Sequence, residues 1–204
     1  MRRRAPESAL RLLCLSILLL AVVGSAGSAR AGKTEFGASW NVALPLDNTS
    51  DFAKTVTARS FTLEYHRYLR RDTSWGINAG WTVFNHRADD TTYGPNWAIT
   101  GQRWNTINAV PLYASTFHYW GDNRRRTSVF AGANLGATWA EYRTTVGLYE
   151  FKDQNWHLAV APEIGLMMPR SSVMGFISVR YNLLMKAGDI DTQSWIELRI
   201  GFGR

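Results

Sequence analysis

The sequence predicts an all-β fold, an eight-stranded antiparallel up-and-down transmembrane β-barrel. Three observations support this prediction. Apolar side chains recur at every second residue in one run after another, which is the period of a strand with two different faces. The connections between these runs alternate between long and short, as at the two rims of an up-and-down barrel. The last run, 194–202, has the length of a tilted strand that crosses a bilayer, about nine residues.

Residues 1–31 are predicted to be a secretory signal peptide. Three arginines at positions 2–4 precede an apolar core over 12–23, and Ala-Arg-Ala at 29–31 provides a cleavage site. The apolar core is too short to span a bilayer as a helix. Cleavage would leave residues 32–204 as a single barrel domain.

Loss of this segment changes the charge and the cysteine content. It lowers the formal net charge from +7 to +3 and removes Cys14, the one cysteine of the chain. Most of the basic character thus belongs to the export signal, so no nucleic-acid partner is expected. An exported domain without disulfides needs another source of stability, and a closed hydrogen-bonded barrel would supply it.

The first three strands are expected over 34–44, 57–69 and 74–84. In the first, Phe36, Trp40 and Leu44 share one face, and small or polar residues occupy the other. A polar break over 45–50 precedes the second strand, and a tight polar turn over 70–73 separates the second from the third. This turn between two alternating runs is the clearest hairpin signal in the chain.

The fourth strand is expected over 101–120, after a long polar connection over 85–100. Pro111 in this strand indicates a β-bulge, because proline cannot donate to the ladder. The fifth strand alternates from Ser128 to Trp139, and a connection over 147–154 leads to the sixth, which alternates from Trp156 to Leu166. The seventh strand includes residues 177–183, and a connection over 186–193 leads to the last.

The last strand carries the expected membrane-insertion signal. Its alternating apolar face ends on an aromatic residue, which resembles the terminal signature recognised by the barrel-assembly machinery, and Gly203 and Arg204 follow that residue. An even number of strands places both termini at the short-turn rim, which is the periplasmic one. The residues of the signal are Ile196, Leu198, Ile200 and Phe202.

Alternation alone does not say which face of the strands contacts water. A secreted lipocalin-like barrel has the same period, but its apolar face points into the barrel and its polar face points outward. Glycines fall on the polar face, where they fit the crowded interior of an eight-stranded barrel. Aromatic residues gather near both rims, as in the girdles of membrane barrels. The sequence therefore favours an apolar face toward lipid. The expected girdle residues are Tyr68, Trp75, Trp81, Trp104, Trp120, Trp139 and Trp156.

The polar face then places several charged side chains in one narrow lumen. Charges in a confined space of low dielectric constant must pair or lose their charge. We therefore expect an interior salt-bridge network that plugs the lumen. Its predicted members are Glu64, His66, His157, Glu163, Arg180, Glu197 and Arg199.

The whole mature chain resembles small outer-membrane β-barrel proteins of the OmpA, OmpX and OmpW type. The motifs that carry the resemblance lie at 46–52, 80–84 and 186–195, together with the last strand. The nearest pattern is that of the exported barrel-domain proteins of Bacteroidetes-like bacteria. The resemblance implies a bacterial outer-membrane location, outer-membrane lipids as surroundings and a monomeric barrel, but it implies little about activity.

The sequence gives little sign of catalysis. The four histidines lack zinc-ligand spacing, and no G-x-S-x-G motif is present. We therefore expect no enzyme, no catalytic residues and no cofactor. Asp189 and Asp191, with Asp153 or the pair at 89–90, are weak candidates for a divalent-cation site, and solvated acidic turns explain them better. Arginines in the short turns are candidates for contact with anionic lipid head groups.

The sequence thus predicts a structural or interaction protein that binds an extracellular ligand or surface partner through its long loops. One alternative is an OmpW-like conduit for a small hydrophobic ligand, which requires an apolar upper lumen. A second alternative is a barrel enzyme that acts on outer-membrane lipid.

Overall fold

The computed structural model describes residues 34–70, 72–93, 99–121, 127–170 and 173–204. The predicted signal peptide lies outside these residues. No helix in the described part of the chain is long and apolar enough to cross a membrane.

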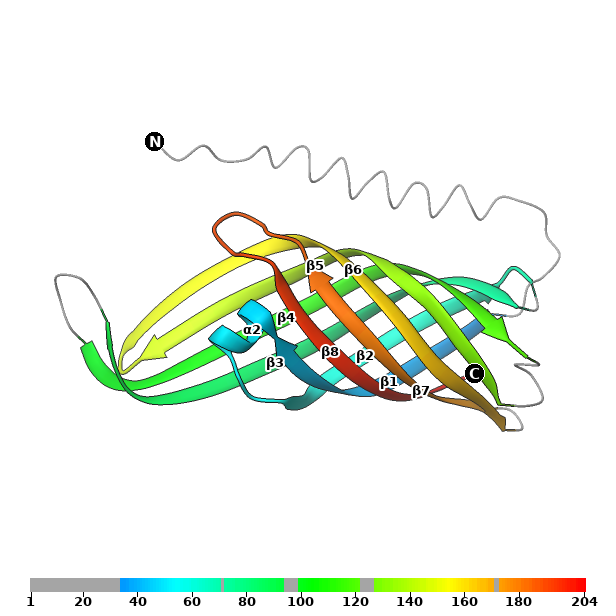
Figure 1. The fold of residues 1–204 in the computed structure, drawn as a ribbon, viewed down its shortest axis with the longest axis horizontal. Coiled ribbons are helices and arrows are strands. Elements are labelled where there is room, and N and C mark those ends of the chain that lie inside the picture. Colours follow the sequence, from blue (N-terminus) through cyan, green and yellow to red (C-terminus); the bar gives the residue numbers. More distant parts are fainter. Residues whose placement is uncertain (1–33, 71, 94–98, 122–126, 171–172) are drawn as a thin grey trace. The chain divides into compact units, whose positions relative to one another are not determined.

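Eight antiparallel strands form one closed sheet, in which each strand pairs with the next and β8 pairs with β1 (Figure 1). A short helix, α2, follows β1. This topology confirms the predicted eight-stranded up-and-down barrel. The elements are β1 (Thr34–Leu46), α2 (Asp47–Phe52), β2 (Thr57–Tyr68), β3 (Thr73–Tyr93), β4 (Ile99–Trp120), β5 (Ser128–Val146), β6 (Tyr149–Arg170), β7 (Val173–Leu184) and β8 (Gln193–Gly203).

The apolar faces of the strands point outward. In β1, Phe36 and Trp40 are exposed, whereas Ser39 and Asn41 are buried. The other strands also point their apolar face outward and their polar face inward, so that a belt of large apolar side chains surrounds a polar interior. An apolar belt of this kind is the surface that a membrane barrel presents to lipid. The outward direction of the apolar face overturns the lipocalin-like alternative, in which this face would line an interior pocket.

The four middle strands extend beyond the limits expected from the sequence. β3 continues to Tyr93 through residues assigned to a polar connection, and β6 already begins at Tyr149. The expected connection over 147–154 is a turn at Gly147 and Leu148, where the positive φ of Gly147 suits a tight hairpin. These extensions lack an alternating apolar face, so a search for hydrophobic periodicity does not detect them.

Pro111 does not lie at a β-bulge. β4 and β5 keep a single register along their whole ladder, including the pair of Pro111 and Thr138. The ladder between β3 and β4 shifts its register at a different place, between Ala88 and Thr91. The missing N–H of proline is accommodated without an inserted residue, and the bulge prediction was wrong.

The barrel has two ends, which differ in what they carry. The terminal end holds the start of β1, the end of β8 and the connections after β2, β4 and β6. The α2 end holds α2 and the connections after β3, β5 and β7. At the α2 end, β3, β4, β5 and β6 continue past the other strands (Figure 1). We call this four-stranded extension the projecting sheet.

Candidate functional site

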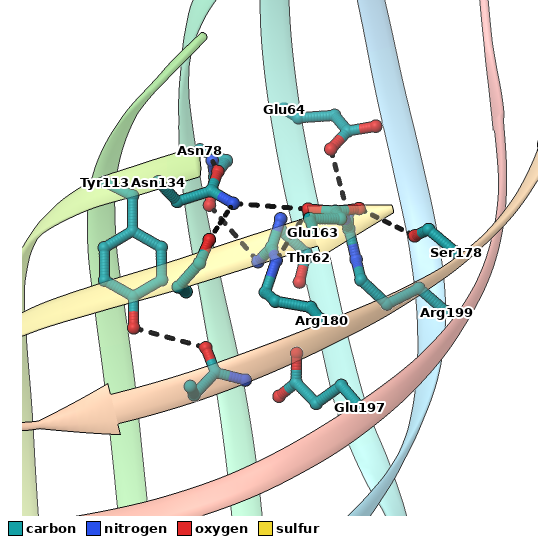
Figure 2. Close-up of polar contacts among 12 residues, drawn as sticks. Thr62, Glu64, Asn78, Tyr113, Asn134, Glu163, Ser178, Arg180, Glu197 and Arg199 are labelled. Atoms are coloured by element: carbon teal, nitrogen blue, oxygen red, sulfur yellow. Dashed lines mark hydrogen bonds and ion pairs between the residues drawn. The ribbon is translucent and has the colours of Figure 1, made fainter. Parts of the chain in front are cut away.

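Four buried charges form the centre of the lumen, and we call them the ionic layer: Glu64 on β2, Glu163 on β6, Arg180 on β7 and Arg199 on β8 (Figure 2). Nε of Arg180 lies 2.8 Å from Oε2 of Glu163. Arg199 forms ion pairs with Oε1 of Glu163 and, at 2.8 Å, with Oε2 of Glu64. Glu163 is thus shared by both arginines, and the two acids balance the two cations.

Neutral side chains complete the hydrogen bonding of Glu163. Ser178 Oγ donates to Oε1 over 2.6 Å, and Asn134 Nδ2 donates to Oε2 over 3.3 Å. Asn134 in turn accepts a hydrogen bond of 2.9 Å from Asn78 Nδ2. A buried ion pair avoids a large desolvation penalty only when its remaining lone pairs and protons find partners. Here Asn134 on β5 and Ser178 on β7 provide partners for the carboxylate, whereas Arg180 Nη2 and Arg199 Nε find no hydrogen-bond partner within the described part of the chain.

Each arginine also faces an aromatic ring. The guanidinium carbon of Arg180 lies 5.9 Å from the ring centroid of Tyr113, and that of Arg199 lies 5.3 Å from that of Phe176. Both distances fall within the range of a cation–π interaction. Tyr113 and Phe176 belong to different apolar clusters. The arginines therefore connect the ionic layer to apolar side chains on both sides of it.

Glycines allow this crowding. A Cβ atom built on Gly201 would collide with the ring of Phe176, and one built on Gly132 would collide with Phe117. Both glycines face the lumen, beside aromatic rings that occupy the space of a side chain. These contacts are consistent with the prediction that glycine on the polar face indicates a crowded interior.

The other predicted members of the network occupy different surroundings. His66 lies beside the ionic layer, with Nε2 3.7 Å from Oε2 of Glu64. Glu197 accepts hydrogen bonds of 3.0 Å from both Thr82 Oγ1 and Trp195 Nε1. His157 is separate from the network, since its Nδ1 lies 2.8 Å from the carbonyl oxygen of Met185. All seven predicted residues are buried, but His157 lies outside the ionic layer.

The lumen toward the α2 end contains an apolar cluster among buried polar side chains such as Thr82 and Glu197, and sequence reasoning missed this cluster. We call this region the α2-side cluster. The rings of Phe84 and Trp195 meet edge to face at 5.8 Å, and Phe52 of α2 meets Tyr142 at 5.6 Å. The large members are Phe84, Ile107, Tyr113, Tyr142, Leu184, Ile190 and Trp195. The inward register of Trp195 was the available signal for this cluster.

Helix α2 covers the α2-side cluster. Thr49 Oγ1 donates to Gln193 Oε1 over 2.9 Å and accepts from the backbone N–H of Ser194 over 3.0 Å. Asn105 Nδ2 donates to the carbonyl oxygen of Phe52 over 2.7 Å. The helix is thus held to β4 and β8 by polar contacts. Residues 47–50 of this helix belong to the polar break that was predicted after the first strand.

A second apolar group, the terminal-side cluster, fills the lumen toward the terminal end. Tyr68 belongs to it, so its assignment to a lipid-facing girdle was wrong. The side chain is buried and donates a hydrogen bond of 2.8 Å to Glu35 Oε2. Tyr68 lies on the polar face of β2, and its place near a rim was mistaken for a girdle position. The cluster contains Tyr68, Phe117, Tyr119, Phe130, Met167, Met174 and Phe176.

The other expected girdle residues lie on the outer face. Trp81, Trp104 and Trp156 are exposed toward the α2 end, and Trp120 is exposed toward the terminal end. Trp75 and Trp139 are half-buried on the same outward face. In β8, Leu198, Ile200 and Phe202 are exposed and Ile196 is half-buried, which is the register expected of the insertion signal.

No residue set within the described part of the chain forms a group of three histidines, cysteines or acids able to hold a metal ion. Asp191 lies 2.6 Å from Nζ of Lys186, and this hydrogen bond raises the pKa of the lysine. The side chains of residues 89 and 90, and most of the short-turn arginines, lie outside the described side chains.

Comparison with solved structures identifies the fold. Ail, the attachment invasion locus protein of Yersinia pestis, was solved in complex with the heparin analogue sucrose octasulfate. It is 11% identical over 84% of this chain and 97% of its own, with a TM-score of 0.51. Neisserial surface protein A is 12% identical over 83% of this chain and 94% of its own, with a TM-score of 0.53.

This is the fold of a small outer-membrane β-barrel. No protein-family model matches the chain, and no curated protein matches it. The likeness supports the OmpA- and OmpX-like resemblance at the level of the fold, and the more specific resemblance to Bacteroidetes-like barrel proteins stays a prediction.

Proposed function

We propose that this protein is an integral outer-membrane barrel with a plugged lumen, which binds an extracellular partner through its projecting sheet. The observation that carries this proposal is the pair of open edges on that sheet. The ladder between β2 and β3 ends at Ser60 and Thr82, although β3 remains paired with β4 as far as Tyr93. Likewise, β6 pairs with β7 only from Ala159, although it pairs with β5 from Tyr149.

Open edges of this kind favour binding by strand addition. Backbone N–H and C=O groups along an unpaired edge form a template on which an extended segment of another protein can pair. Apolar side chains at the hairpin tip add contact area: Leu148 is fully exposed, and Tyr149 and Phe151 are 60% and 49% exposed. Exposed apolar groups that extend past the lipid-facing belt are typical of interaction sites.

The ionic layer supports the plugged lumen. Its buried ion pairs join side chains from β2, β6, β7 and β8 across the interior, and aromatic clusters pack on both sides. An eight-stranded barrel has an interior just wide enough for such side chains to fill. The protein should therefore give no steady ionic conductance when it is inserted into a planar lipid bilayer, whereas a constant open-channel current would contradict the plug.

Location and export have direct tests. After extraction in mild detergent, the mature protein should change its gel mobility on boiling, because a folded barrel migrates differently from the unfolded chain. N-terminal sequencing of the outer-membrane fraction should begin at Gly32 if residues 1–31 are removed. A protein that stays soluble and folded without detergent would contradict the membrane assignment.

Site-specific photocrosslinking in intact cells tests the binding surface. A photoreactive residue at position 149, in place of Tyr149, should give protein adducts when the cells are irradiated in the environment in which they normally grow. The same residue at Leu69, which is exposed at the terminal end, should not give these adducts. Shortening the β5–β6 hairpin by equal numbers of residues on both strands should abolish binding of the crosslinked partner. Normal binding by the shortened variant would reject the projecting sheet as the site.

A second function, a conduit or carrier for a small hydrophobic ligand, is favoured by the α2-side cluster. The cluster gives this part of the lumen an apolar region, as such a ligand requires, and α2 covers it through a few polar contacts. An environment-sensitive apolar dye should then bind at this end and lose binding when Leu184 is replaced by a larger tryptophan. Unchanged dye binding in that variant would exclude the carrier function.

A further inference from the structure

The outer wall of the barrel contains a groove beside the projecting sheet. Its volume is about 520 Å³. It lies where the ladder between β2 and β3 stops at Ser60 and Thr82, while β3 continues alone on this side. The lining residues are Trp40, Ala58, Arg59, Ser60, Phe61, Trp81, Val83, Asn85 and Asn108. The part of the groove nearer the terminal end therefore faces lipid, and the other part opens toward the α2 end.

One side of the groove is apolar and structurally fixed. The rings of Phe61 and Trp81 meet edge to face at a centroid distance of 6.1 Å. Trp40 is held against the start of β2, because its Nε1 donates a hydrogen bond of 2.8 Å to the carbonyl oxygen of Ala58. All three rings are also about half exposed on the lipid-facing surface. An acyl chain could lie along these rings as a continuation of the membrane interior.

The opposite side of the groove is cationic and polar. When the amide of Asn85 is oriented with its oxygen toward Arg59, it accepts a hydrogen bond of 3.0 Å from Nη1. No carboxylate lines the groove among the described residues. Two acids contact lining residues from behind: Glu197, buried in the lumen, accepts from Ser60 Oγ over 3.5 Å, and Glu141 accepts from Asn108 Nδ2 over 3.5 Å. Glu141 is itself paired with Arg143 and Lys152. The local charge thus favours an anion near Arg59.

We propose that this groove binds one phosphorylated lipid of the membrane leaflet at the α2 end. Arg59 would contact the phosphate, and the rings of Trp40, Phe61 and Trp81 would pack along an acyl chain. A volume of this size falls within the usual range of small-molecule sites, about 300–1,000 Å³. The combination of aromatic rings in the belt and a cation at its edge matches an amphipathic anion and matches neither a free ion nor a wholly apolar ligand.

The chain offers a matched control for this site. Arg67 lies on the same strand and the same outward face as Arg59, at the other end of the apolar residues Phe61, Leu63 and Tyr65. Arg59→Gln and Arg67→Gln thus remove the same charge from one strand at opposite membrane interfaces. A general effect of net charge on lipid affinity would be equal in the two variants.

Native mass spectrometry of the detergent-solubilised barrel provides the measurement. Phosphatidic acid, phosphatidylcholine and inorganic phosphate are added separately, and the fraction of protein with one bound ligand is titrated. We expect one phosphatidic acid to bind more tightly than phosphatidylcholine, with no retention of inorganic phosphate. Arg59→Gln should weaken phosphatidic acid binding about fivefold, since a cation at a membrane surface contributes about 1 kcal/mol. Arg67→Gln should leave it unchanged.

A second variant separates the groove from its charge. Val83→Phe keeps Arg59 but fills the floor of the groove, where Val83 is almost buried. It should weaken binding of the single lipid at least as much as Arg59→Gln. Heat-modifiability confirms that each variant is folded. Equal loss in both arginine variants, retention of phosphate alone, or unchanged binding in Val83→Phe would each overturn the proposal.

Discussion

The ionic layer and the α2-side cluster lie next to each other in one lumen, but they are filled in opposite ways. In the ionic layer, Glu163 is shared by Arg180 and Arg199, which reach it from neighbouring strands. In the α2-side cluster, Phe84 and Trp195 pack through ring contacts, and the short helix α2 covers them.

This difference separates two roles for one interior. Breaking a buried ion pair leaves an uncompensated charge, which is strongly destabilising, so the ionic layer is suited to close the lumen permanently. An apolar cluster can exchange one apolar neighbour for another at a smaller cost, provided that the volume is conserved. The α2-side cluster is therefore the part of the lumen where a ligand could replace a side chain.

The largest effect is expected for Glu163→Ala. Both arginines lose their shared carboxylate, so the free energy of unfolding should fall by about 3–5 kcal/mol. Urea unfolding of the lipid-reconstituted protein, followed by tryptophan fluorescence, measures the change. Glu150→Ala, at a half-exposed acid of the projecting sheet, is the control and should change it little. A loss below about 1 kcal/mol in Glu163→Ala would show that the ionic layer does not hold the barrel closed.

A smaller effect is expected for Phe84→Ala in the α2-side cluster. Removal of this fully buried ring should lower the free energy of unfolding by about 3 kcal/mol, because a cavity remains. The same urea titration measures it. Phe202→Ala removes the same ring from the lipid-facing surface and should cost much less. The comparison fails if the two phenylalanine variants are equally destabilised.

The cover of the cluster is tested by Thr49→Val. This change keeps the shape of the side chain but removes both hydrogen bonds of the hydroxyl, so we expect a loss of about 1–2 kcal/mol. Hydrogen exchange should accelerate in α2 and at Ser194, with the strands of the ionic layer unchanged. Ser50→Ala is the control, since the Ser50 hydroxyl bonds only within the helix segment. Uniform acceleration over all strands would mean that α2 is not a separate cover.

The smallest effect belongs to the projecting sheet, at Glu141. A hydrogen bond of this carboxyl with Lys152, supported by Arg143, lowers its pKa. Because the unfolded chain takes up the proton first as the pH falls, the stabilisation is present above the ordinary carboxyl pKa of about 4.5 and is lost through the lowered folded value. Glu141→Gln should therefore cost less than about 1 kcal/mol at neutral pH and nothing in strong acid. A cost that persists in acid would contradict this origin.

The period of the apolar residues was sufficient to predict the topology, because each lipid-facing strand must alternate. It also placed Glu64, Glu163, Arg180 and Arg199 in the lumen. It did not reveal which acid would be shared, since Glu163 becomes central only through the strand registers. The extensions of β3 and β6 were missed because water on both faces removes the alternation, and Tyr68 was misplaced because a rim position does not determine the face.

The pairing of β8 with β1 has a consequence for the order of events in folding. The amide of Phe36 donates to the carbonyl oxygen of Arg204, and the amide of Arg204 donates to that of Phe36, each over 2.9 Å. These bonds join segments separated by almost the whole barrel sequence, and contacts between such distant segments form slowly. The edge of β1 that pairs with β8 therefore has no partner until the last strand has been synthesised. A nascent chain must be protected from aggregation for that entire interval.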